Sequence, residues 1–398
     1  MRKNLPLTLI FFVVFIDLLG FGILIPILPT FAVNELHVNE GAVGVAIAAY
    51  SFIQFIFNPI FGGLSDRYGR RKIILFTLLL NATGYVIFAY THNFPMLLLS
   101  RVIAGMGGSS IGVAQAYIAD VTTPQERSRG MGLIGVAFGL GFVFGPLIGG
   151  ILSKFGYEVT GLAAAGFSVL ALIVSFFSLP EPEKKKTDPQ LRRKIFDPQS
   201  FKVVFRSRAI SFTILSFFFL TFSMANIYGT FALLGHLVYN LSDFQNGLMF
   251  GLTGFVSAAI QGGFIGKLNK KLGDKKLVIY GLVFMTIGLA MLPFGVNIYG
   301  LIAVLIVLSI GTGIVQPTLL SLVSKVTKEN EQGLVLGTNQ SIASLARVLG
   351  PLWGGFSYQW LGYTIPFLTG SFVGVIMIIY SLKYFDKFIN LNNHTHGH

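Results

Sequence analysis

The sequence Gly-Gly-Leu-Ser-Asp-Arg-Tyr-Gly-Arg-Arg-Lys occupies residues 62–72 and forms a short charged loop between two long apolar runs. Its spacing of glycine, leucine and cations returns about 204 residues later, at residues 266–276, as Gly-Lys-Leu-Asn-Lys-Lys-Leu-Gly-Asp-Lys-Lys. A second segment is also repeated: Gly-Pro-Leu-Ile-Gly-Gly at 145–150 returns about 205 residues later as Gly-Pro-Leu-Trp-Gly-Gly at 350–355. Two segments repeated at nearly the same spacing predict a chain made of two copies of one unit.

The composition indicates a membrane protein. Of the 398 residues, 53% are hydrophobic, which is more than a soluble chain could keep from water, and there is no cysteine for disulfides or thiolate metal sites. Each crossing of a bilayer needs about 20 apolar residues. The sequence therefore predicts an all-α integral membrane fold with twelve transmembrane helices, at residues 6–28, 42–62, 73–91, 95–119, 131–153, 159–179, 209–235, 245–268, 277–296, 300–325, 333–357 and 364–385. The first span lacks a small-residue cleavage site, so we expect a retained helix rather than a signal peptide.

The basic charges predict the topology. Of 29 lysines and arginines, 26 lie in the N-terminus, alternate loops and the C-terminus, and the exceptions are Lys154, Arg101 and Arg347. By the positive-inside rule, this asymmetry places both termini in the cytoplasm. The net charge of +13 then faces anionic membrane lipids, and we expect no nucleic-acid partner.

A basic linker at 180–208 separates the predicted units at 1–179 and 209–385, and a cytoplasmic tail follows at 386–398. The tail carries alternating histidines at 394, 396 and 398 that could bind a metal, but we expect a disordered chain end and no metal site. There is no phosphate-cradling Gly-Lys-Ser/Thr loop, no His-Glu-x-x-His and no acid pair within the spans, so we expect neither an enzyme nor an ATP-driven pump.

Asp17 is the only acidic residue deep in any predicted span. An ionised carboxylate there costs several kcal/mol, and burial favours its neutral form, so Asp17 is a candidate proton carrier. The alternative is a structural partner for a nearby cation. Arg101 in the fourth span needs an anion, and Asp17 is the only deep candidate. Gly105 and the glycines that follow it would let the first and fourth helices approach closely enough for this pair.

Asp66 can pair with Arg70 or cap a neighbouring helix N-terminus, and Asp120 offers a second anion for the same basic cluster. These charges predict a conformational latch that holds while the cytoplasmic side is closed. Its candidate residues are Gly62, Asp66, Arg67, Gly69, Arg70, Arg71 and Asp120. The alternative is a topology determinant with solvated charges, which would explain the cations but neither the acids nor the glycines.

Polar residues within other spans are candidates for a substrate cavity. Tyr50, Gln54 and Asn58 recur every four residues, so they share one helical face. Lining of a cavity and interhelical hydrogen bonding explain this face equally well. The remaining candidates are Asn226, Tyr228, Gln261, Gln316, Asn339, Gln340 and Arg347, of which Arg347 has no acid at similar depth in its half.

The fifth span carries a stripe of small residues at four-residue spacing, which predicts close helix packing and a contact for rocking motion. The stripe comprises Gly141, Gly145, Gly149 and Gly150, with Pro146 adding a kink.

These motifs together resemble the major facilitator superfamily, and within it the twelve-helix drug:proton antiporters, from end to end. Residues 62–71 are similar to the superfamily loop between helices two and three, and residues 19–29 resemble the first-helix signature. Arg101 with Gly105 resembles the fourth-helix signature, and residues 141–150 resemble the fifth-helix antiporter signature.

Within that family the chain looks closest to tetracycline exporters, whose pattern it matches at Asp17, Gln54, Asp66, Arg70, Arg101, Asp120 and Gln261. It departs from them where Gly84 and Met285 replace acids and Ser257 replaces a histidine. These departures argue against tetracycline itself as the substrate.

The resemblance implies two six-helix bundles around a central cavity, in a cofactor-free monomer of the cell membrane. It implies alternating access, with inward proton flow through Asp17, tuned by Arg101, driving export of a small amphipathic or cationic compound. One alternative is a symporter or uniporter for an anionic metabolite or lipid-like solute that uses Arg101 and Arg347. Another is a membrane receptor or scaffold that does not transport.

Overall fold

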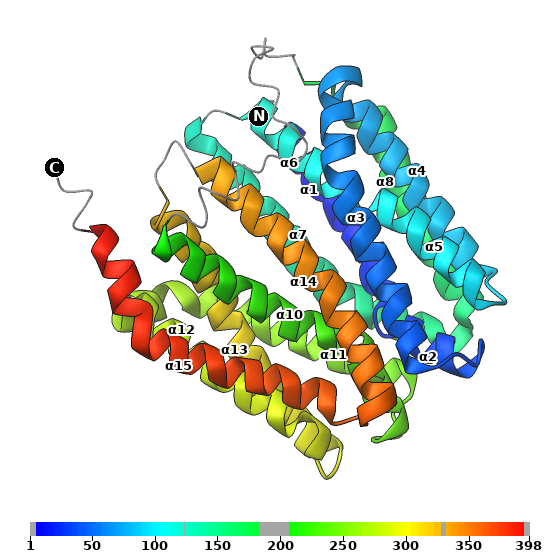
Figure 1. Cartoon of the computed structure of the whole chain (residues 1–398). Coiled ribbons are helices and arrows are strands. Elements are labelled where there is room, and N and C mark those ends of the chain that lie inside the picture. The colour runs from blue at the N-terminus through cyan, green and yellow to red at the C-terminus, as the bar shows by residue number, and fades with distance from the viewer. Residues whose placement is uncertain (1–4, 123, 183–206, 328–331, 394–398) are drawn as a thin grey trace. The chain divides into compact units, whose positions relative to one another are not determined.

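The computed structural model describes residues 5–122, 124–182, 207–327 and 332–393, and every regular element among them is a helix. Most of the predicted linker and the histidine-rich end of the tail lie outside the described residues. The chain divides into two compact units (Figure 1): unit 1 comprises Met1–Ile195 with Asn240–Gly251, and unit 2 comprises Phe196–Tyr239 with Leu252–His398.

Proline and glycine interrupt two spans of unit 1. The first span bends between Leu24 and Leu28, beside Pro26 and Pro29, and the fourth is broken at 108–109, beside Gly107 and Gly108. The helices before the linker are α1 (Leu5–Leu24), α2 (Leu28–Asn34), α3 (Glu40–Tyr68), α4 (Arg70–Ala89), α5 (Phe94–Gly107), α6 (Ser110–Val121), α7 (Pro124–Leu152), η2 (Ser153–Phe155) and α8 (Tyr157–Ser178). Helix α4 packs against α5 and α8, and α1 packs against α7 and α8.

The second half is built from longer helices. They are α10 (Arg208–Leu237), α11 (Asp243–Ala259), the π-helical turn η4 (Ile260–Phe264), α12 (Ile265–Met291), η5 (Leu292–Phe294), α13 (Ile298–Lys325), α14 (Gln332–Leu361) and α15 (Ile365–Asn393). The second copy of the charged loop lies within the bounds of α12, where Gly273 leaves helical geometry with a φ of 74°. In unit 2, α12 packs against α13 and α15, and α10 packs against α14 and α15.

Asparagines begin three of these helices. Asn39, Asn93 and Asn297 each accept a hydrogen bond from a backbone N–H of the first turn, at 2.8–3.0 Å. Such caps satisfy donors that the helix itself leaves unpaired. They explain locally why α3, α5 and α13 begin where they do.

The described helices are long and apolar enough to confirm the predicted membrane fold. Ten helical segments meet the length and hydropathy expected of a membrane span, and one of them, Asp243–Phe294, is 52 residues long and contains two predicted spans. Helix α14 contains the remaining predicted span and has 30 residues, but polar side chains such as Asn339 and Arg347 make it less apolar than the ten.

Glycines let α1 and α7 touch backbone to backbone. A Cβ atom placed on Gly145 would lie 2.6 Å from Gly22 Cα and 3.1 Å from the Ile23 backbone nitrogen, which no real side chain tolerates. Close backbone approach of this kind is how helices gain packing energy in lipid, where apolar burial gives little.

The sequence repeat reappears in this packing. Gly350 lies about 205 residues after Gly145, and a Cβ on it would lie 2.9 Å from the Asn226 backbone nitrogen of α10. Helix α14 thus packs on α10 as α7 packs on α1, and each contact depends on glycine.

We predict that Gly145→Val destabilises the protein by about 3 kcal/mol, the upper end of overpacking costs, because the obstructing atoms belong to backbone that cannot move aside. Gly139→Val is the matched control, because a Cβ at Gly139 of the same helix meets no atom of the described part of the chain within 4 Å. Heating purified protein and measuring the monodisperse fraction by size-exclusion chromatography compares the two. Equal thermal stability of both variants would contradict the packing argument.

Candidate functional site

Asp17 lies on α1 with only 4% of its surface exposed, and each oxygen of its carboxylate accepts one hydrogen bond. The Asn81 amide of α4 donates to Oδ1 and the Ser110 hydroxyl of α6 donates to Oδ2, both at 2.5 Å. No described cation forms a salt bridge with it. Because a hydroxyl can also accept, Ser110 can hold Asp17 in either protonation state.

Sequence reasoning missed both partners of Asp17. Ser110 is the first residue of α6, so the break after Gly107 determines its position. Asn81 lies in the third span and is 1% exposed. A polar amide in an otherwise apolar span was the available signal for Asn81, whereas nothing in the sequence distinguished Ser110 from the serine beside it.

The structure places Arg101 apart from Asp17, although an ion pair between them was expected. Arg101 is 3% exposed, its Nε donates to the Ser100 hydroxyl at 3.2 Å, and its guanidinium carbon lies 5.3 Å from the centre of the Phe88 ring. Its Nη2 has no hydrogen-bond partner among the described residues. Arg101 lies nine residues before Ser110, on the other side of the break at 108–109, so Asp17 and Arg101 use different partners on the fourth span.

The charged loop forms a polar cluster centred on Arg70 at the start of α4. Arg70 pairs with Asp66 at 2.5 Å and with Asp120 at 2.8 Å, and its Nη1 donates to the Ser65 hydroxyl at 2.6 Å. One guanidinium therefore ties the end of α3 to the end of α6. Both ion pairs of this charged-loop cluster were anticipated from the sequence.

Glu181, which sequence reasoning did not select, caps α4 from the chain that follows α8. Its carboxylate accepts hydrogen bonds from the backbone nitrogens of Arg70 at 2.6 Å and Arg71 at 3.2 Å. An anion at a helix N-terminus satisfies orphan donors and complements the helix dipole. Gly69 is required here because its φ is 108° and a Cβ on it would lie 2.8 Å from the Glu181 carboxylate.

Two further loop cations act differently. The Arg71 guanidinium donates to the Phe176 backbone carbonyl and lies over the Phe176 ring, so it also ties α4 to α8. The Arg67 guanidinium lies over the neighbouring Tyr68 ring, 5.3 Å from its centre. No heavy atom of the described residues lies within 4 Å of a Cβ placed on Gly62, so close packing among them does not explain that glycine.

The second copy of the loop centres on an acid instead. Asp274 accepts a hydrogen bond from the Asn269 amide at 2.6 Å and pairs with Lys325 of α13 at 2.7 Å. Lys275 pairs with Asp386 of α15. The repeat thus keeps an interhelical polar cluster but reverses the sign of its central group.

The three polar residues of α3 serve different purposes. The Gln54 amide donates to the Gly108 carbonyl at 2.8 Å, which is interhelical bonding at the break in the fourth span. The Tyr50 ring is 8% exposed and stacks on Phe21 with centres 4.9 Å apart. Asn58 Oδ1 has no hydrogen-bond partner among the described residues.

In unit 2, two of the cavity candidates are buried. The Asn226 side chain of α10 is 1% exposed and donates to the Pro366 carbonyl of α15 at 2.5 Å, so it serves an interhelical contact. Asn339 is 2% exposed. Gln261, Gln316 and Gln340 are exposed, Tyr228 is half-buried, and the Arg347 Nη2 donates to the Ser344 hydroxyl at 2.8 Å.

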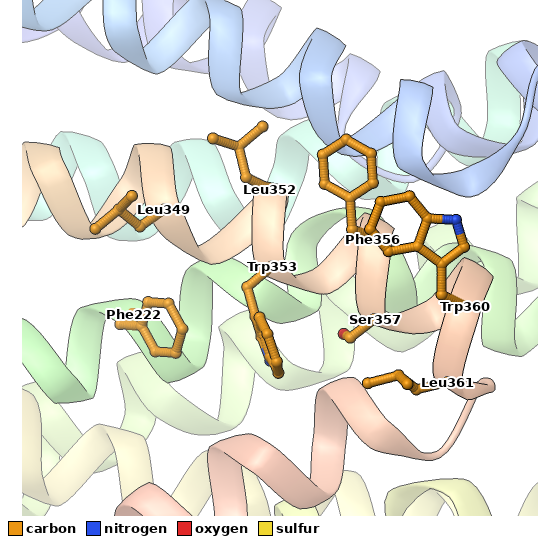
Figure 2. A pocket seen from close by; sticks show the side chains of 8 residues that line it. All are labelled: Phe222, Leu349, Leu352, Trp353, Phe356, Ser357, Trp360 and Leu361. Atoms are coloured by element: carbon orange, nitrogen blue, oxygen red, sulfur yellow. The ribbon is translucent and has the colours of Figure 1, made fainter.

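An apolar groove of about 540 Å³ runs between α10 and α14 (Figure 2), and no predicted cavity residue lines it. Aromatic rings dominate its wall, and Phe356 stacks on Trp360 with ring centres 4.9 Å apart. The lining residues are Phe222, Leu349, Leu352, Trp353, Phe356, Ser357, Trp360 and Leu361. The spacing 349, 353, 356 and 360 was a readable helical stripe that sequence reasoning passed over in favour of polar residues.

Comparison with known proteins agrees with this architecture. The chain is 31% identical to the tetracycline resistance protein, class C, of Escherichia coli, over 88% of this chain and 89% of that protein. It is 30% identical to multidrug resistance protein 1 of Bacillus subtilis (strain 168), over 90% of this chain and 91% of the other.

Solved structures share the fold. The human organic anion transporter MFSD10 (TETRAN) is 26% identical, covers 96% of this chain with all of its own, and superposes with a TM-score of 0.71. The nucleoside transporter NupG superposes with a TM-score of 0.77 at 13% identity, over 97% of this chain and 99% of that one, which shows likeness of fold alone. A sequence model described as Major Facilitator Superfamily matches residues 10–263 and 257–391. The chain belongs to the major facilitator superfamily and is a multi-pass membrane transporter.

Proposed function

We propose that this transporter exports a small amphipathic or cationic compound in exchange for protons, and that Asp17 carries the proton. The observation that carries the proposal is the Asp17 carboxyl, buried in the membrane interior and held by two neutral donors with no described counter-ion. Without a cation beside it, such a group gains its negative charge only at a cost of several kcal/mol. The Asp17 carboxyl is therefore suited to bind and release a proton.

Proton binding at Asp17 would favour one orientation of the transporter over the other. The neutral carboxyl no longer attracts a cationic substrate, whereas the ionised carboxylate does, so proton and substrate compete for one site. A ligand shifts the balance between two orientations only through its different affinity for them. Competition adds the condition for exchange, because a site that holds either a proton or a substrate carries only one of the two in each crossing. Inward movement of protons then drives outward movement of substrate.

Two observations support a drug-sized amphipathic substrate, and a third argues against tetracycline itself. Relatives near 30% identity are named for multidrug and tetracycline resistance. The groove on α14 offers aromatic surface of the kind that binds the apolar part of a ligand. The positions where tetracycline exporters carry acids are filled by packing here: a Cβ on Gly84 would lie 2.7 Å from the Ala104 backbone nitrogen, and Met285 is 1% exposed.

The orientation that we propose places both termini and the charged-loop cluster on the cytoplasmic side, as the distribution of lysine and arginine predicts. Arg70 then joins helix ends on that face, where a reversible latch would stabilise one orientation. We propose a monomer as the working unit.

A second candidate function is transport of an organic anion. The buried Arg101 has a guanidinium nitrogen with no described partner, and a structural relative at 26% identity is an organic anion transporter. Uptake by proteoliposomes of a fluorescent anion, with Arg101→Lys as the variant, distinguishes this function. Transport of anions but of no cation would replace the first proposal.

We predict that Asp17→Asn abolishes pH-gradient-driven efflux of a fluorescent cationic dye from proteoliposomes while leaving folded protein, because asparagine keeps the shape but cannot bind and release the proton. Asp386→Asn is the control, an equal charge change at an exposed carboxylate paired with Lys275. Full coupled transport by Asp17→Asn would rule out the assignment of the proton site.

We predict that Arg70→Gln slows transport about tenfold, because loss of about 1.4 kcal/mol from one state shifts a two-state equilibrium by that factor. Lys72→Gln removes the same charge two residues away, where no ion pair with a described residue is lost, and should transport normally. Thermal stability should fall by about 1–2 kcal/mol, since Arg70 loses two partly buried ion pairs that contribute up to about 1 kcal/mol each. Equal transport rates for the two variants would show that the loop needs only its charge.

A further inference from the structure

One face of α4 runs between Asp17 and Arg101. Asn81, Tyr85 and Phe88 are spaced four and three residues apart, so they share one side of the helix. Asn81 donates to Asp17 at one end of this face, and Phe88 lies beneath the Arg101 guanidinium at the other. Tyr85 is the residue between these two contacts, and all three side chains are 1% exposed.

The Tyr85 hydroxyl is buried without a hydrogen-bond partner among the described residues. Its ring is closely packed: a Cβ on Gly20 of α1 would lie 3.1 Å from Tyr85 Cε2 and 3.6 Å from the Ser168 hydroxyl of α8. An unpaired buried hydroxyl costs free energy, and phenylalanine would fill the same space without that cost. The hydroxyl therefore needs an explanation that packing does not supply.

Ionisable groups on three helices are near enough to interact electrostatically with Tyr85, namely Asp17 of α1, Tyr50 of α3 and Arg101 of α5. Helix α8 contributes the Ser168 hydroxyl, which does not titrate near neutral pH. The tyrosine of α6, Tyr117, directs its hydroxyl to the Pro180 carbonyl at 2.9 Å. Asp17 and Arg101 are thus the two groups near Tyr85 that are charged at neutral pH when Asp17 is deprotonated.

The chemistry of the three groups is complementary. A tyrosine hydroxyl donates one hydrogen bond and accepts others, a carboxylate has about four acceptor sites, and a guanidinium has only donors. Asp17 accepts two hydrogen bonds from described residues, which leaves acceptor capacity for a third, and Arg101 Nη2 is a donor with no described partner. One hydroxyl can serve both groups at once.

We propose that the Tyr85 hydroxyl positions the proton site, by donating to the Asp17 carboxylate and accepting from Arg101 Nη2 in another state of the transport cycle. The inference rests on the proposed role of Asp17 as proton carrier. Tyr85 would link two charged groups that do not contact each other in this structure, so that the protonation of Asp17 changes the surroundings of Arg101. It acts through Asp17 rather than by binding the transported compound.

The test is Tyr85→Phe, reconstituted in proteoliposomes beside Tyr117→Phe and Asp17→Asn. Tyr117→Phe is the matched control, because it removes a hydroxyl from an equally buried tyrosine whose hydrogen bond lies elsewhere. The readouts are gradient-driven efflux of a cationic dye, the pH dependence of dye exchange without a gradient, and thermal stability in detergent.

We expect Tyr85→Phe to retain or slightly raise thermal stability. The rate of gradient-driven efflux should fall about fivefold or more. Losing a donor to the carboxylate favours the protonated form, so the midpoint of the exchange profile should move about one pH unit upward. Tyr117→Phe should keep the wild-type midpoint.

Two outcomes overturn the inference and are distinguishable. If Asp17→Asn loses coupling while Tyr85→Phe keeps the wild-type rate and midpoint, the role of Tyr85 is wrong and the proton site stands. If Asp17→Asn keeps coupled efflux, the proton site is wrong and the role of Tyr85 falls with it.

Discussion

Burial of one carboxyl group in a membrane interior is the constraint on which the first half of this molecule depends. Asp17 needs hydrogen-bond donors, and they come from two other helices, Asn81 of α4 and Ser110 of α6. The contact of α1 with α7 requires the absence of side chains, because the two backbones meet at Gly22 and Gly145. Helix α1 is thus held by backbone packing on one side and by its acid on another.

The two copies of the repeat have kept their packing and diverged in their chemistry. Glycine contacts join α1 to α7 and α10 to α14 at equivalent positions. At the repeat offset, however, Asp17 corresponds to Thr221 or Phe222, neither of which binds a proton near neutral pH. The second copy instead carries the aromatic groove, to which Phe222 itself contributes. If Asp17 carries the proton as proposed, the two copies divide the work, with proton chemistry in the first and apolar surface in the second.

The sequence predicted the membrane fold, the twelve spans and the internal repeat, because length and hydropathy decide these features locally. It also selected Asp17 and both acids that pair with Arg70, since charges are rare in such a chain. It did not predict the donors to Asp17, because Ser110 becomes special only through the helix break before it.

Partners that depend on the three-dimensional arrangement of helices were beyond sequence reasoning. Glu181 reaches the start of α4 across 111 residues of sequence, and no local pattern encodes that contact. The polar face of α3 was equally readable as cavity or packing residues, and Asn226 was selected for the cavity. The structure assigns Gln54 and Asn226 to interhelical hydrogen bonds, while the exposed Gln261, Gln316 and Gln340 stay predictions for the cavity.

The central claim is that substrate displaces a proton from Asp17. It is tested most directly by adding a cationic substrate to purified transporter in weakly buffered detergent solution and following the pH with an indicator dye. At a pH where Asp17 is protonated, the account predicts release of about one proton for each bound cation and none from Asp17→Asn. Saturating binding without proton release, or equal release from Asp17→Asn, would contradict it.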